Sequence, residues 1–161
     1  GLGMAASVRV GWAVGRRDSQ AVRRAVWVAL CASAAMMTAF MLLFLLMPAA
    51  LASLLADHEP MIAVAVGLIP IAGVFQIGDG LQVVAVGCLR GLGDVRSAVI
   101  ANGVGFWLLG LTIGSALAFG AGMGPAGLWW GLAIGLFAVA IGLLKVLAVR
   151  AAQDRERLQV D

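Results

Sequence analysis

The sequence has few charged residues for its length. Asp, Glu, Lys and Arg make up 12% of its 161 residues, whereas soluble domains usually contain about 25%. Hydrophobic residues make up 63% of the chain, and its mean hydropathy is +1.05. This balance excludes an ordinary soluble domain and predicts a protein whose apolar surfaces face lipid.

Histidine and cysteine are also scarce, which limits the chemistry that the chain can perform. The single histidine is His58, and the two cysteines, Cys31 and Cys88, lie in apolar runs. These residues provide neither the spacing of a metal site nor a Ser-His-Asp or Cys-His arrangement. We therefore predict no catalytic residues, no bound metal, no enzyme activity and no nucleic-acid partner.

Four apolar runs are long enough to cross a bilayer, which takes about 20 residues of helix. They cover residues 25–55, 61–89, 97–120 and 126–149, and residues 1–15 resemble the end of a fifth span. The predicted fold class is all-α, a polytopic transmembrane helix bundle. Pro48 and Pro70 each remove a backbone donor inside a run, so we expect both to kink their helices.

Glycines four residues apart recur in or beside the last three runs. This spacing places flat surfaces on one helix face and lets neighbouring helices approach closely. We expect the spans to pack into one bundle through these faces, which contain Gly87 and Gly91, Gly110 and Gly114, and Gly127, Gly131 and Gly135.

The charged residues alternate between connectors and predict the orientation of the spans. The connector with Asp57, His58 and Glu59 has no Lys or Arg, whereas all eleven basic residues fall on the other side. Because short basic loops are retained in the cytoplasm, we predict that both ends of the four-span unit are cytoplasmic, in the cell's inner (plasma) membrane. The basic residues are Arg9, Arg16, Arg17, Arg23, Arg24, Arg90, Arg96, Lys145, Arg150, Arg155 and Arg157.

An acidic residue lies in the middle of the second full run. Asp79 stands between two glycines in the stretch FQIGDGLQ, and a charged carboxylate at this depth costs about 2.5–3.5 kcal/mol on insertion scales. One interpretation is a protonated Asp79 that hydrogen-bonds to a neighbouring helix, for instance to Asn102. The other is a cation or proton site, which Gln76 and Gln82, three residues to either side, would support with neutral donors and acceptors.

The stretch FQIGDGLQVVAVGCLRGLGDVR, residues 75–96, resembles the tenth span and following loop of the MATE (multidrug and toxin extrusion) antiporters. The segments MAASVRVGWAVGRRD, NGVGFWLLGLTIGSAL and GPAGLWWGLAIG are similar to the end of their eighth span, to their eleventh span and to the start of their twelfth. The resemblance implies that residues 1–161 are a partial C-terminal lobe of a twelve-span transporter. Because the first residue is also not Met, we expect a fragment of a longer protein.

The resemblance also implies a function. Members of the MATE family export cationic organic compounds in exchange for sodium or protons. The resemblance therefore implies multidrug efflux by ion-coupled antiport, with no cofactor besides the coupling ion. Asp79 matches the tenth-span aspartate that the family implies in cation binding, with Gln76, Gln82 and Asn102 as possible cavity residues. The expected partners are membrane lipid, the missing N-terminal lobe and cationic small-molecule substrates, and we do not expect the fragment to be active alone.

The connector CLRGLGDVR contains a further charged group. Arg90, Asp94 and Arg96 lie at the predicted cytoplasmic ends of two helices. One interpretation is a solvated cluster that satisfies the helix ends. The other is a gate contact that changes during transport.

Two other functions stay open at this point. A related lipid-linked or polysaccharide flippase should have a more basic cavity for its anionic headgroup, and Lys145, the basic residue deepest in a run, is near enough to an end to snorkel. A structural membrane subunit would use Asp79 only to pair helices.

Overall fold

Helices account for all the regular secondary structure in the part of the chain that the structure, a computed structural model, describes: residues 1–55 and 58–160. Residues 55 and 154–160 are described by their backbone alone. In chain order the elements are α1 (Leu2–Gly15), α2 (Ser19–Leu46), α3 (Pro48–Leu55), α4 (Glu59–Gly91), α5 (Val95–Asn102), η1 (Gly103–Gly110), α6 (Leu111–Ser115), η2 (Ala116–Gly120) and α7 (Gly124–Val160).

Four helical stretches are long and apolar enough to span a membrane. They are Ser19–Leu46, Glu59–Gly91, Val95–Gly120 and Gly124–Gln153. The third of them runs without interruption through α5, η1, α6 and η2. The shorter helix α1, 14 residues long, packs against α2 and α4. The predicted all-α transmembrane bundle is therefore confirmed.

The first full span differs from its predicted bounds of 25–55. Helix α2 begins at Ser19 and ends at Leu46, and Pro48 begins the separate helix α3. Proline has no N–H to donate, and its fixed φ suits the first position of a helix. Pro48 therefore ends one helix and starts another where we expected a kink, whereas Pro70 lies inside the continuous helix α4.

The glycine faces pack as predicted. A Cβ atom added to Gly91 on α4 would lie 2.7 Å from the backbone oxygen of Ser7 on α1, and one added to Gly135 on α7 would lie 2.7 Å from Cα of Gly110. Real Cβ atoms do not approach other heavy atoms so closely, so a side chain at these positions would push the helices apart. Glycine is what allows backbone to touch backbone at both interfaces.

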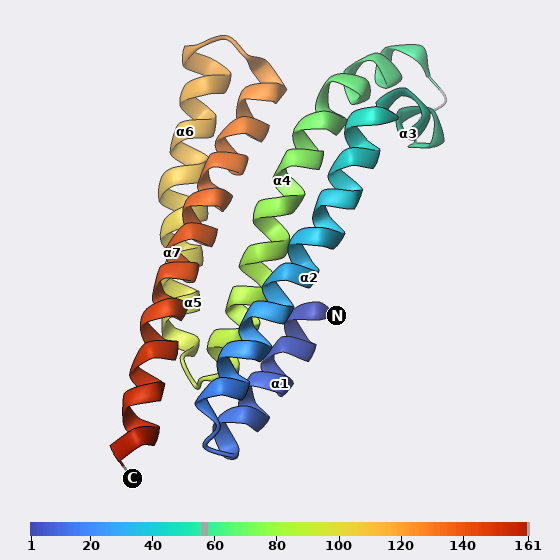
Figure 1. Ribbon diagram of the computed structural model, residues 1–161. Coiled ribbons are helices and arrows are strands. Elements are labelled where there is room, and N and C mark those ends of the chain that lie inside the picture. Colours follow the sequence, from blue (N-terminus) through green and yellow to red (C-terminus); the bar gives the residue numbers. More distant parts are fainter. Residues whose placement is uncertain (56–57, 161) are drawn as a thin grey trace.

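Helix α4 is the central element of the bundle. It contacts α1, α2 and α3 on one side and α5 and α7 on the other. Figure 1 shows the α2–α4 pair and the α6–α7 pair close together near the α4–α5 connector and diverging toward the other end. The buried core is concentrated where α1 joins the bundle, with Val10, Val84, Leu89 and Leu143 almost fully enclosed.

The connectors lie at two opposite ends of the bundle (Figure 1). The α1–α2 and α4–α5 connectors are at the same end as the last turns of α7, and the start of α4 and the η2–α7 connector are at the other end. Arg16 and Arg90 therefore share one end, and His58 and Glu59 are at the opposite one. Asp57, which we placed with His58 and Glu59, lies outside the described residues.

Candidate functional site

Asp79 lies on the open side of α4, between two helix contacts. Its side chain is exposed, and no ion pair or hydrogen bond joins it to another side chain in the described part of the chain. The glycines beside it are buried: a Cβ atom on Gly78 would lie 3.2 Å from Leu136 of α7, and one on Gly80 would lie 2.9 Å from Ser33 Oγ of α2. The small neighbours let α7 and α2 close in on both sides and leave the carboxylate on the face between them.

Gln82 connects α4 to the next span. Its side chain is 8% exposed, and its Nε2 donates a hydrogen bond to Oδ1 of Asn102. Asn102 in turn donates from Nδ2 to the backbone oxygen of Ala98, at 2.9 Å. The structure thus brings Gln82 and Asn102 together, and it is Gln82, not Asp79, that binds Asn102. The side chains of Asp79 and Gln82 leave α4 about 60° apart, which is enough to send one to the open face and the other toward α5.

Three buried oxygen atoms close to Asp79 along the bundle have no hydrogen-bond partner among the described residues. They are Oε1 of Gln76, Oε1 of Gln82 and Oγ of Ser33. Buried polar atoms normally have partners, and amide, hydroxyl and carboxylate oxygens are the ligands that hard cations prefer. They do not form one ligand set, because Ser33 faces Gly80 across the α2 interface whereas Gln82 turns toward α5.

Ser33 was missed in the reading of the sequence. It is one of several small residues in the apolar run of α2, and it is only 1% exposed. Nothing in the run marks it as a partner of α4, because the register of α2 against Gly80 is a tertiary property.

The span that contains Asn102 is wound unusually. Directly after Asn102 the backbone forms the π-helix η1, and after the short helix α6 it forms a second one, η2. π-helical turns are rare and occur frequently at functional sites. Here η1 begins directly after the residue that binds Gln82, and both π-helical segments contact α7.

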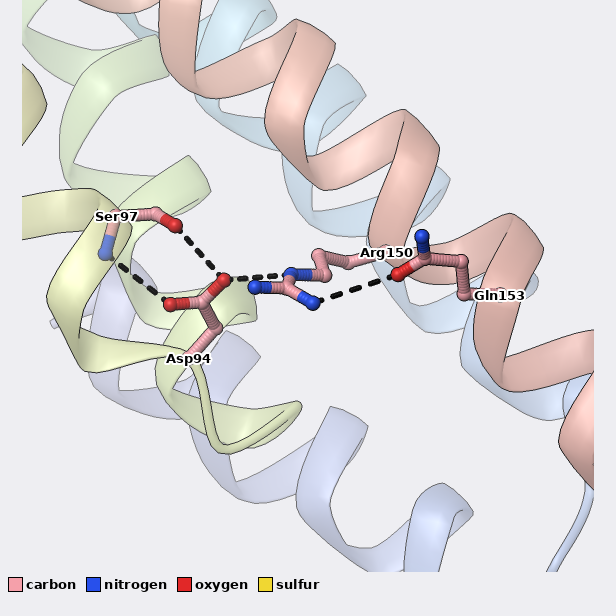
Figure 2. Close-up of polar contacts among 4 residues, drawn as sticks. All are labelled: Asp94, Ser97, Arg150 and Gln153. Atoms are coloured by element: carbon pink, nitrogen blue, oxygen red, sulfur yellow. Dashed lines mark hydrogen bonds and ion pairs between the residues drawn. The ribbon is translucent and has the colours of Figure 1, made fainter.

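Asp94 caps the start of α5 and binds α7. Its Oδ1 accepts a hydrogen bond from the backbone N–H of Ser97 (3.1 Å), and its Oδ2 accepts from the Ser97 hydroxyl (2.8 Å) and from Nε of Arg150 (2.7 Å). Figure 2 shows the carboxylate between Ser97 and the Arg150 guanidinium, which also donates to Gln153 at 3.4 Å. The hydrogen bonds from Ser97, and after them Arg150, lower the pKa of Asp94.

Of the three charged residues that the sequence groups in this connector, only Asp94 forms an ion pair in the described chain. Arg90 and Arg96 are both exposed, and neither forms an ion pair with Asp94 in the described chain. The ion pair of Asp94 is formed with Arg150, which is 56 residues away in sequence. A cap at Asp94 could be predicted from the Asp-x-x-Ser spacing, but the choice of arginine depends on how α7 lies beside α5.

The chain is similar to known membrane transporters. The MatE family model matches residues 1–115. The multidrug resistance protein NorM of Burkholderia vietnamiensis is 45% identical over 145 residues, which cover 87% of this chain and 31% of that protein. The probable multidrug resistance protein NorM of Deinococcus radiodurans is 40% identical over 160 residues, which cover 96% of this chain and 36% of that protein.

A solved structure has the same fold. The crystal structure of the eukaryotic MATE transporter AtDTX14 matches with a TM-score of 0.86 at 25% identity, over 98% of this chain and 36% of that one. The chain thus spans about a third of the length of the relatives that it matches.

Proposed function

The chain belongs to the MatE family, and from this membership we propose that it forms the C-terminal part of a secondary active antiporter. The complete transporter exports cationic organic compounds in exchange for sodium or protons. The rest of the protein, including an N-terminal lobe, completes the transport path, so the 161 residues alone do not transport. The protein lies in the plasma membrane with both ends of the four-span unit in the cytoplasm.

The observation that carries this proposal is the position of Asp79. In the four candidate spans it is the one acidic residue away from a helix end. A lone carboxylate at this depth is costly when charged, so it binds whatever cation neutralises it. Within the described chain its side chain is exposed on the open face of α4.

Competition for this carboxylate would produce exchange. A proton, a sodium ion or a cationic substrate can each neutralise Asp79, and two of them cannot do so at once. Binding of the coupling ion from outside would displace the substrate, and binding of the substrate from inside would displace the ion. Gln76, whose Oε1 is buried without a described partner, lies one turn earlier on α4 and could supply a neutral oxygen ligand.

The distribution of basic residues favours a cationic cargo over an anionic headgroup. In the described spans the Lys and Arg residues lie within a few turns of the end that carries the C-terminus, and none accompanies Asp79 at mid-helix. A flippase for an anionic lipid-linked sugar would need positive charge in its cavity. The proposal therefore keeps efflux of cations as the function.

The test uses the transporter that contains this segment, reconstituted into vesicles. Asp79→Asn keeps the size and polarity of the side chain but removes its charge, and we expect loss of drug efflux driven by a sodium or proton gradient. Glu59→Gln, at the first turn of α4, removes a carboxylate outside the hydrocarbon region and should leave efflux intact. Wild-type efflux by the Asp79→Asn protein would refute the proposal.

A further inference from the structure

A long groove lies between α2 and α7, on the opposite side of α4 from Asp79. Its volume is about 1010 Å³, and Leu81 of α4 forms part of its lining. Leu81 is two residues after Asp79, so the two side chains leave the helix about 160° apart. The groove is therefore separate from the face on which the proposed transport site lies.

The groove is apolar over most of its length. On α2 it is lined by Leu30 and Ala34, and on α7 by Leu144, Leu147 and Ala148. Small residues on both helices leave room for a chain of methylene groups, and no charged side chain is part of this stretch of the lining. The chemistry of this surface suits a hydrocarbon chain and not a polar ligand.

Positive charge is concentrated at one end of the groove. Arg23 and Arg24, both exposed, line it together with Gln20 in the first turns of α2. Trp27 follows one turn deeper, where an indole favours the boundary between headgroups and hydrocarbon. This end coincides with the end of the bundle that carries the basic connectors.

Asp18 and Asp94, acidic residues described near this end, already accept hydrogen bonds from other groups. The Asp18 side chain caps α2 by accepting from the backbone N–H of Ala21 at 2.9 Å. Asp94 is bound to Ser97 and Arg150. Arg23 and Arg24 form no ion pair with any acidic side chain that the structure describes. Both side chains are exposed, so an anion at the membrane surface can reach them.

The length of the groove fits one leaflet of a bilayer. From Ser19 to Ala34 the lining of α2 extends about 22 Å along the helix. Half of a hydrocarbon core is about 15 Å thick, which leaves several Å for a phosphate at the arginine end. A ligand with one anionic head and an acyl tail would fill the groove from end to end.

We propose that this groove binds an anionic phospholipid, with its phosphate on Arg23 and Arg24 and one acyl chain along the apolar walls of α2 and α7. Guanidinium groups bind phosphate through paired, charge-assisted hydrogen bonds. The acyl chain fills the space that separates α2 from α7 and holds the two helices in place. This site does not depend on the proposed transport function, because it lies on the other side of α4.

Other occupants would behave differently. A cationic drug would be repelled by the two arginines. Another segment of the same transporter would cover the groove and keep lipid out. Measuring which lipid stays bound to the protein, and at which residues, distinguishes both cases from a bound anionic phospholipid.

The experiment measures lipid bound to the purified transporter by native mass spectrometry, with phosphatidylglycerol and phosphatidylcholine as probes. Arg23→Gln with Arg24→Gln should weaken phosphatidylglycerol binding roughly 10- to 30-fold, since each basic residue near an anionic headgroup contributes about 1 kcal/mol. The control, Arg9→Gln with Arg16→Gln, removes the same charge from exposed positions that do not line the groove and should leave binding nearly unchanged.

A second pair of variants tests the apolar walls without changing charge. Ala148→Trp fills the groove and should displace bound phosphatidylglycerol, whereas Val149→Trp, on an exposed position outside the lining, should not. Equal binding by the groove variants and their controls would overturn the proposal, as would equal retention of phosphatidylcholine and phosphatidylglycerol. Neither readout requires transport, so loss of efflux on Asp79→Asn and loss of lipid here are independent results.

Discussion

Arg150 donates a hydrogen bond from Nε to Oδ2 of Asp94 at 2.7 Å, across 56 residues of sequence. The contact joins α7, near the end of its membrane span, to the residue that caps the start of α5. The same carboxylate caps α5 through Ser97. One acidic side chain therefore fixes both the start of the third span and its distance from the fourth.

The ion pair and the cap should be separable by mutation. Asp94→Ala removes both, and we expect a loss of about 1–2 kcal/mol, most of it from the cap. Arg150→Gln removes only the pair, and because its side chain is 49% exposed the expected loss is about 0.2–1 kcal/mol. The measurement is reversible unfolding of the purified transporter in mixed micelles.

A double-mutant cycle checks this assignment. Asp94→Asn keeps an oxygen for Ser97 while removing the charge, so it should resemble Arg150→Gln. Combining Asp94→Asn with Arg150→Gln should cost little more than either change alone. Full additivity would mean that Arg150 and Asp94 do not interact in the folded protein.

The Asp94 contacts should depend on pH in one direction. Their hydrogen bonds lower the folded-state pKa below the ordinary value of 3.8, so the stabilisation is complete above that value and is lost as pH falls through the lowered pKa. We expect the stability difference between the wild type and Asp94→Asn to stay constant from about pH 8 to pH 5 and to shrink only below about pH 4. A difference that disappears near pH 6 would contradict this.

The glycine interface between α6 and α7 should not tolerate a methyl group. A Cβ atom on Gly131 would overlap the backbone of Gly114, so Gly131→Ala should separate the helices and cost about 1–3 kcal/mol. Gly142, also on α7, has nothing within 4 Å of such an atom, and Gly142→Ala should be neutral or stabilising by up to about 1 kcal/mol. Thermal stability and yield of folded protein in mild detergent would show the difference.

Orientation can be tested with single cysteines in a transporter that lacks Cys31 and Cys88. Cysteines at His58 and Met123, at one end of the bundle, should react with an impermeant thiol reagent added outside intact cells. A cysteine at Arg16, at the other end, should react only after the cells are opened, because basic connectors are retained inside. The reverse pattern would invert the proposed topology, and labelling at both ends of intact cells would contradict it altogether.

The sequence predicted the features that depend on local composition. Spans follow from the length of apolar runs, and the close approach of Gly131 to α6 follows from glycines four residues apart. The depth of Asp79 could be predicted for the same reason. Pro48 was harder, because proline either kinks a helix or starts a new one, and the packing of α3 against α4 decides which.

Features that depend on how helices are turned against each other could not be predicted. Gln82 and Gln76 are equally far from Asp79 in sequence, yet Gln82 binds Asn102 because α5 lies on its side of α4. No local sequence pattern indicates that Asp94 pairs with Arg150 and not with Arg90 or Arg96. No residue pattern marked the two π-helical segments that follow Asn102 in the third span.

The glycines beside Asp79 restrict how α4 can move. Gly78 is held against α7, Gly80 against α2, and Gly87 touches the backbone of Gly3 on α1. Rotation of α4 about its own axis in either direction would drive one of these contacts into overlap. These contacts therefore tie α1, α2, α4 and the adjoining part of α7 into one packed unit, in which a displacement of α4 displaces its neighbours as well.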